Sequence, residues 1–227
     1  MSARTAGVGE LDWTIDPPEG VLVVPAVGTE TPEAISAWEQ EVTEALRVSF
    51  EEQTPEGYDL SDDERAYVLE TVTASLANLR AQADRGAPAG ERVVAAFGLS
   101  DRGPVPVVVS VGMSDPDTPD DALLEALGAK GGGAPLNPPS VEYLDLPDGD
   151  GVRVSRLDFA NDGGAWLSVG LGRRTEYPDA VVDTVVLWRT QDLFVVPLMM
   201  EVLDTLLPAI TITRSESTGS ESTGSES

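Results

Sequence analysis

The chain contains no histidine and no cysteine, and its only lysine is Lys130. Histidine and cysteine supply the general bases, thiol nucleophiles and metal ligands of most catalytic, zinc, haem and iron–sulfur sites. A Ser-His-Asp triad and disulfide bonds are therefore excluded, and a lysine Schiff base would depend on Lys130 alone. We expect no cofactor and no enzymatic activity, and a fold stabilised by burial of apolar side chains.

Positive charge is also scarce, with 14 Lys and Arg residues against 40 Asp and Glu and a formal net charge of −26. A field of this sign repels polyanions and anionic membranes, so we expect neither nucleic acid nor a membrane as a partner. No run approaches the roughly 18 apolar residues of a membrane span. Met1–Glu10 has no apolar segment typical of a secretory signal. These features favour a cytoplasmic location. Codon bias in a high-G+C genome and adaptation to salt both remain open as origins of the acidity.

The composition varies along the 227 residues. Residues 214–227 repeat Ser-Glu-Ser-Thr-Gly and contain no apolar residue, so we expect a disordered tail, serving for solubility or as a phosphorylation or tethering segment. Residues 1–10 are expected to be flexible. The intervening residues 11–213 have the length of a single domain, and with 41% hydrophobic residues in the chain they can form a core.

Residues 31–53 and 61–86 are predicted to form a helical hairpin. Thr31-Pro32 is a typical helix start, and Ser61-Asp62-Asp63-Glu64 is a capping box whose acids favour the positive end of the helix dipole. Gly86 is a natural stop. Apolar residues recur at three- and four-residue steps in both segments, namely Ile35, Trp38, Val42, Leu46 and Phe50, then Val68, Val72, Leu76, Leu79 and Ala83.

After Gly86 the apolar period changes from 3.6 to 2, which indicates strands. The predicted strands, including one before the helices, are residues 21–25, 93–99, 105–113, 141–146, 152–159, 165–173, 181–189 and 210–212. Short turns rich in Gly, Pro, Asn and Asp separate most of them and favour antiparallel pairing. Pro104 and Pro106 lack N–H donors, so their strand should begin at a sheet edge or be locally unpaired. Thr118-Pro119 predicts a short helix. Pro197 predicts a last helix with Leu198, Met199, Val202, Leu203, Leu206 and Leu207 inside. The expected fold class is α+β, an antiparallel sheet of about six to eight strands covered by helices.

Three kinds of local motif are candidates for chemistry. Residues 115–121 and 145–151 are rich in acids, but neither has the spacing of an EF-hand loop, and a helix start and a hairpin turn explain them better. We therefore predict no metal site. Residues 167–173 (LSVGLGR) carry a G-x-G inside a strand, without the frame of a phosphate-binding loop. Paired carboxylates stay open as a hydrolase alternative, because 40 acids guarantee that some pair lies close.

The arginines are unevenly distributed. Residues 151–190 hold five arginines and five acids, so this segment is neutral and the rest of the chain carries the whole charge of −26. A neutral surface would let a protein partner approach, and Trp and Arg are frequent anchors at protein interfaces. The candidate partner-binding residues are Arg153, Arg156, Trp166, Arg173, Arg174, Trp188 and Arg189. The alternative is structural, with cross-strand ion pairs and tryptophans in the core. Arg173 and Arg174 must point to opposite faces of a regular strand.

The two ends of the domain carry a resemblance. Leu11–Val21, with an aromatic residue before a Pro-rich turn and a strand, is similar to the start of small actinobacterial proteins of unknown function, and Met199–Leu207 is similar to their closing helix. Those proteins in turn resemble the α-β-α sandwich of the PsbP/LpqN type. The resemblance implies a scaffold that binds partners without catalysis, and no catalytic residue carries over. Without a lipoprotein cysteine, the envelope location of LpqN is not expected here.

The function predicted from the sequence is a non-catalytic acidic protein-interaction module, for example a chaperone or an accessory subunit of a secretion or cell-envelope system. High net charge favours solubility and steers basic partners. Two alternatives remain open, a carboxylate-dependent hydrolase and an acidic mimic of nucleic acid.

Overall fold

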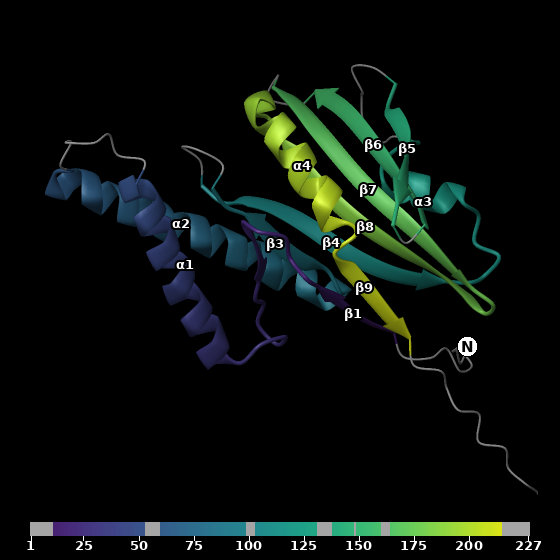
Figure 1. The fold of residues 1–227 in the computed structure, drawn as a ribbon, viewed down its shortest axis with the longest axis horizontal. Coiled ribbons are helices and arrows are strands. Elements are labelled where there is room, and N and C mark those ends of the chain that lie inside the picture. Colours follow the sequence, from purple (N-terminus) through teal and green to yellow (C-terminus); the bar gives the residue numbers. More distant parts are fainter. Residues whose placement is uncertain are drawn as a thin grey trace, which may run out of the picture.

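A computed structural model describes residues 11–52, 60–98, 103–130, 138–147, 149–159 and 164–214, and the side chains of 49–52 are not described. The predicted flexible N-terminus and repeat tail lie outside the described residues, except for Arg214. The helices and strands are β1 (Leu11–Ile15), β2 (Val21–Val24), α1 (Pro32–Glu52), α2 (Asp62–Gly86), the 3₁₀ helix η1 (Ala87–Ala89), β3 (Arg92–Ala96), β4 (Val105–Ser114), α3 (Asp121–Ala126), β5 (Ser140–Leu146), β6 (Gly149–Phe159), β7 (Ala165–Tyr177), β8 (Ala180–Thr190), the 3₁₀ helix η2 (Leu193–Val195), α4 (Val196–Leu206) and β9 (Ile210–Arg214) (Figure 1).

The strands form a seven-stranded sheet in the order β2-β3-β4-β8-β7-β6-β5 and a two-stranded sheet of β1 and β9. Every neighbouring pair in both sheets is antiparallel, which confirms the predicted α+β fold class. A tight turn joins β7 to β8, where only Pro178 and Asp179 lie between the two strands. The proline prediction for β4 also holds, since β3 pairs with Pro106 whereas pairing with β8 begins only at Val108.

Side-chain alternation divides the large sheet into two covered faces, giving a three-layer arrangement. Residues such as Val107, Leu171 and Val186 pack against Met199 and Leu203 of α4, which lies across the front of the sheet in Figure 1. On the opposite face, α2 packs directly on β2 and β3 and α1 packs on α2. The short helix α3 covers β6 and β8 on that same face, through Leu123 and Leu127. Because residues alternate along each strand, one sheet serves both apolar layers.

Both long helices begin where the sequence predicts. The Ala34 N–H donates to Thr31 Oγ1 at 3.2 Å. The Ser61 capping box is complete, with a donor–acceptor distance of 2.8 Å from the Ser61 N–H to the Glu64 carboxylate. The helices share an apolar cluster, and Arg80 of α2 donates to Glu39 of α1 at 2.5 Å. Figure 1 shows α1 crossing α2 at an angle instead of lying beside it, and residues 53–59 lie outside the described residues, so the hairpin stays a prediction.

The predicted end of one helix is confirmed and the predicted start of another is wrong. Helix α2 ends at Gly86 as predicted, although Gly86 keeps a right-handed backbone, and the chain continues into the separate 3₁₀ helix η1 until Gly90, whose φ of 78° is left-handed. The helix predicted to start at Thr118 starts at Asp121, because the Thr118 N–H donates to the Asp115 carbonyl at 2.9 Å and closes a turn first.

The G-x-G of β7 has a packing role. A Cβ atom on Gly172 would lie 2.7 Å from Leu123 Cδ1 and 2.9 Å from Leu127 Cδ1, and one on Gly170 would lie 3.2 Å from the Leu127 carbonyl oxygen. Both distances to Leu side chains are shorter than ordinary van der Waals contact. The absence of side chains at these two positions therefore lets α3 approach the sheet closely.

We expect Gly172→Ala to lower the free energy of unfolding by about 1 to 3 kcal/mol, because the added methyl overpacks the contact between α3 and the sheet. Urea denaturation followed by circular dichroism measures the change. The control is Gly112→Ala, on β4 of the same face, where a Cβ atom meets nothing within 4 Å. An equal loss of stability in both variants would show that the close approach of α3 is not the cause.

Candidate functional site

The structure separates the seven predicted partner-binding residues onto the two faces of the sheet. Arg153, Arg173 and Trp188 lie on the face covered by α4, together with Leu171 and Val186. The other four, Arg156, Trp166, Arg174 and Arg189, lie on the α3 face. The predicted opposition of Arg173 and Arg174 is confirmed by this alternation. The seven residues therefore do not form one continuous surface.

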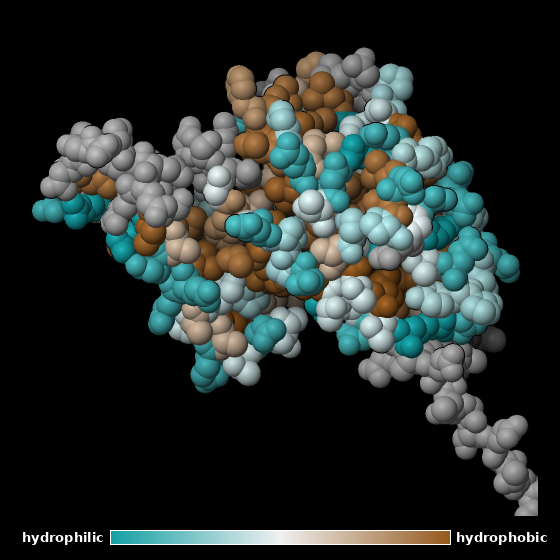
Figure 2. All heavy atoms as spheres, viewed as in Figure 1, coloured by the Kyte–Doolittle hydropathy of each residue, from teal (hydrophilic) through white to brown (hydrophobic). Residues whose placement is uncertain are grey.

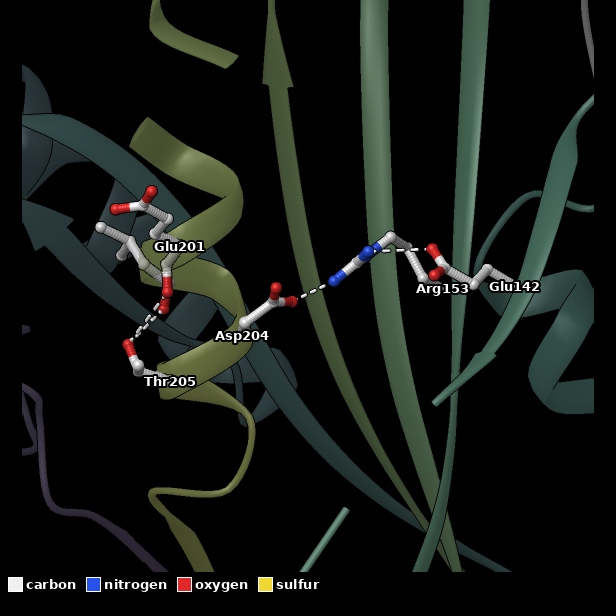
Figure 3. A network of polar contacts seen from close by, with 6 residues as sticks. Glu142, Arg153, Glu201, Asp204 and Thr205 are labelled. Atoms are coloured by element: carbon white, nitrogen blue, oxygen red, sulfur yellow. Dashed lines mark hydrogen bonds and ion pairs between the residues drawn. The ribbon is translucent and has the colours of Figure 1, made fainter. Parts of the chain in front are cut away.

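Arg153 joins the sheet edge to the last helix (Figure 3). Its guanidinium donates to Glu142 of β5 with an N–O distance of 2.9 Å and also to Asp204 of α4. Only 12% of the Arg153 side chain is exposed. One guanidinium that donates to two carboxylates forms two charge-assisted hydrogen bonds, which are stronger than neutral ones. Arg153 therefore has a structural role in docking α4.

Arg173 and Trp188 belong to the interior. Arg173 is buried and donates to the Ile210 carbonyl at 2.8 Å, which fixes the start of β9 over the sheet. Trp188 is 3% exposed and packs in the α4 cluster. At the other end of β9, Arg214 pairs with both Asp179 oxygens at 2.5 Å. These contacts anchor the two-stranded sheet to the seven-stranded one.

Arg174 anchors α3 on the other face. Its guanidinium pairs with both oxygens of Asp183 at 2.8 Å and also donates to the Thr118 carbonyl at 3.2 Å and to Asp120 at 3.1 Å. The hydrogen bond with Asp183 raises the pKa of Arg174 further above its ordinary value. Most of the arginines that make residues 151–190 neutral therefore form ion pairs within the fold, both between strands and between the sheet and a helix.

The remaining predicted residues lie near the far end of β7 and β8. Arg156 is buried and its Nε donates to Asp158 at 2.7 Å. Arg189 is exposed and its guanidinium carbon lies 4.6 Å from the centre of the Trp166 ring, a cation–π geometry. Leu187, 38% exposed, faces the same side. Trp166 and Arg189 offer accessible surface, and their role in binding stays a prediction.

A second exposed surface, which the sequence analysis missed, lies where α4 begins. We call Leu193, Phe194 and Leu198 the apolar tip. Phe194 is 88% exposed, and Leu193 and Leu198 are 55% and 46% exposed. Figure 2 shows hydrophobic side chains gathered at this end of α4. Phe159, also exposed, ends β6 at the same end of the sheet.

The apolar tip is held in place by polar contacts. The Phe194 N–H donates to Asp192 Oδ1 at 3.0 Å, and the Asp192 N–H donates to Thr190 Oγ1 at 2.9 Å. Asp192 therefore caps the short η2 helix that leads into α4. The turn presents its apolar side chains from a fixed backbone, which lowers the entropy cost of binding.

Leu198 was predicted to be inside, and this is wrong. The inward positions are Val195, Met199, Leu203 and Leu206, which follow one another at steps of four, four and three residues. Leu198 lies one residue, or about 100°, away from that stripe. The spacing was visible in the sequence, but an almost continuous apolar run from Leu193 to Val202 concealed which face is buried.

A cleft of about 390 Å³ lies between α3 and the sheet. Its apolar wall comes from Leu123 and Leu124 of α3, and Tyr143 of β5 stands at its rim. The remaining lining residues are Asp120, Asp150, Gly151, Val152, Gly172, Arg174 and Glu176. Despite these carboxylates, no group of three or more acids in the described ranges is arranged to hold a metal ion. No helix in the described part of the chain is long and apolar enough to cross a membrane.

Comparison with known proteins adds a likeness of fold. Neither a family model nor a curated protein sequence matches the chain. A solved structure, that of LpqN involved in cell envelope biogenesis of Mycobacterium tuberculosis, is similar with a TM-score of 0.44 and 11% sequence identity. The match covers 90% of this chain and 85% of that one. The resemblance to an LpqN-type fold is thus found over most of the chain, and at this identity it concerns the fold alone.

We expect Arg173→Glu to lower the free energy of unfolding by about 3 to 5 kcal/mol, because it leaves a buried acid facing the Ile210 carbonyl. The matched variant Arg189→Glu reverses an exposed charge and should cost no more than about 1 kcal/mol, mainly from the lost stacking on Trp166. Thermal and urea denaturation measure both. Equal losses would contradict the structural role assigned to Arg173.

The pair of Asp179 and Arg214 predicts a defined pH dependence. Its hydrogen bond with Arg214 lowers the pKa of Asp179 below the ordinary value of 3.8. Because the pKa of Asp179 is lower in the folded state, its ionised form stabilises the fold at pH values above the ordinary pKa. This contribution is lost as the pH falls through the lowered pKa of the folded state. The difference in unfolding free energy between the wild type and Asp179→Asn should therefore be largest at neutral pH and shrink in acid.

The control for this measurement is Asp117→Asn, which removes an exposed acid that forms no ion pair within the described residues. In a chain with a net charge of −26, this variant should not lose stability at neutral pH. A difference between the wild type and Asp179→Asn that is constant from neutral to acid pH would contradict the assignment.

Proposed function

We propose that this chain is a non-catalytic protein-interaction module that binds its partner through the apolar tip. The observation that carries the proposal is the joint exposure of Leu193, Phe194 and Leu198 on a turn fixed by Asp192. Clustered exposed apolar side chains mark interaction sites in soluble proteins more often than isolated ones do. A role as a chaperone or as an accessory subunit, in the cytoplasm, is part of this proposal.

Burial of the tip offers a clear energetic gain. Fully burying a Leu or Phe side chain is worth about 1.5 to 3 kcal/mol. Phe194 also places an aromatic ring at the centre of the patch, as is common for residues that dominate interface energies. Because Leu198 lies one helical turn after Phe194, both can enter one pocket of a partner.

The charge of the chain determines the kind of partner. Exposed acids such as Glu201 and Asp204 follow the tip along α4, and the whole chain carries −26. Long-range attraction speeds the approach of a partner of opposite charge. We therefore propose a protein with an apolar pocket surrounded by basic residues. Association should slow as salt is added, whereas the apolar contact should be little affected.

The test is affinity capture from native lysate with the wild type, with Phe194→Ser, and with Leu198→Ser as immobilised full-length chains. We expect a protein captured by the wild type to be lost with Phe194→Ser and reduced with Leu198→Ser. Purified partner then gives the affinity by calorimetry, with a loss of at least about tenfold for Phe194→Ser.

The control is Leu69→Ser, which removes a comparably exposed leucine from α2. It should capture the same protein as the wild type does. Equal capture by the wild type and Phe194→Ser, or loss of capture in Leu69→Ser as well, would contradict the proposed role of the tip. Circular dichroism of each variant shows that its fold is retained.

A further inference from the structure

We infer that the free edge of β5, together with the cleft below α3, binds an extended basic segment of a partner protein. This surface lies on the opposite sheet face from α4 and at the opposite end of β6 from the apolar tip. The inference goes beyond the proposed function, because neither surface depends on the other.

The first observation is an unpaired strand edge. β5 is the last strand of the seven-stranded sheet, and within the described ranges no strand pairs with its outer side. In an antiparallel sheet, every second residue of such an edge leaves its backbone N–H and C=O groups available. Extended peptides add to free edges of this kind, with backbone hydrogen bonds for affinity and alternate side chains for specificity.

The second observation is that the exposed side chains of β5 lie beside the cleft. Tyr143 is 77% exposed and stands opposite Val152, which lines the cleft. Val141 and Asp145 lie two residues before and two residues after Tyr143, so their side chains are on the same face of the sheet. A strand added to β5 would therefore direct every second side chain over Tyr143 and toward the cleft.

The third observation concerns charge. Asp150 and Glu176 line the cleft, and Asp145 stands opposite Asp150 across the β5–β6 hairpin. Arg174, the one cation among the described lining residues of the cleft, already pairs with Asp183 and Asp120. Within the described residues, Asp145, Asp150 and Glu176 form no ion pair. Their negative field therefore stays unbalanced.

The chemistry of the cleft fits an arginine or lysine side chain. The aliphatic stem would pack on Leu124, as the stems of long cationic side chains do on apolar surfaces. The cation would meet the Tyr143 ring and the carboxylates of Asp150 and Glu176. A second copy of this chain does not fit the edge, because pairing two β5 edges would bring together two chains of charge −26 each.

The test uses the full-length chain and a short synthetic peptide in which arginine and valine alternate. Two further peptides serve as probes, one with glutamate in place of arginine and one with N-methyl groups on alternate backbone nitrogens, which block strand pairing. Fluorescence anisotropy measures binding at several salt concentrations. We expect the arginine peptide to bind, and neither of the others.

Matched variants locate the site. We expect two variants to bind the arginine peptide at least about fivefold more weakly than the wild type. They are Tyr143→Ala and the double variant Asp150→Asn with Glu176→Gln. The controls Tyr67→Ala on α2 and Glu201→Gln on α4 remove an exposed ring and an exposed acid elsewhere, and should bind like the wild type. Phe194→Ser should also bind normally, so failure of the apolar tip and failure of this inference are distinguishable.

Three outcomes would overturn the inference. Absence of binding by the arginine peptide is the first. Equal binding by the variants and their controls is the second, since it would show unspecific attraction to an acidic protein. The third is undiminished binding by the N-methylated peptide, or a dimer in sedimentation that Tyr143→Ala dissociates, because either would give the β5 edge another role.

Discussion

The fold depends on arginine side chains that connect the large sheet to the elements around it. A charge inside a protein is tolerated only when it is paired and hydrogen-bonded. Arg153 meets this condition by joining β5 to α4, Arg173 by holding the start of β9, and Arg174 by fixing the turn before α3. Helix α4, strand β9 and the turn before α3 thus each have a cationic anchor, in addition to the apolar layers on both faces.

This use of arginine explains the surface that remains. With 14 basic residues against 40 acids, the cations engaged within the fold leave the exterior strongly acidic. Two features differ from that acidic exterior. The apolar tip offers hydrophobic contact without charge, and the β5 edge offers backbone pairing beside unbalanced carboxylates. They lie at opposite ends of the large sheet and on its opposite faces, so each can be occupied without obstructing the other.

Much of the fold could be predicted because it depends on local periodicity. The alternation of residues 165–173 and 181–189 predicts strands β7 and β8, and Ser61 with Glu64 predicts the start of α2. The strand β1 was missed although Leu11, Trp13 and Ile15 alternate with polar residues, because it has only five residues and its partner β9 lies at the other end of the described chain. The start of α3 was misplaced for a different reason, since a turn between the Asp115 carbonyl and the Thr118 N–H precedes the helix.

The sequence by itself determined the fold class, the opposition of Arg173 and Arg174 and the exclusion of histidine and cysteine chemistry. Each of these follows from residue identity or from the two-residue period of a strand. Only the tertiary structure decided that Arg153, Arg173 and Arg174 are anchors, that Leu198 is exposed, and that Tyr143 stands beside Asp150 and Glu176. These facts depend on which elements pack together, and pairing between distant segments leaves no trace in local spacing.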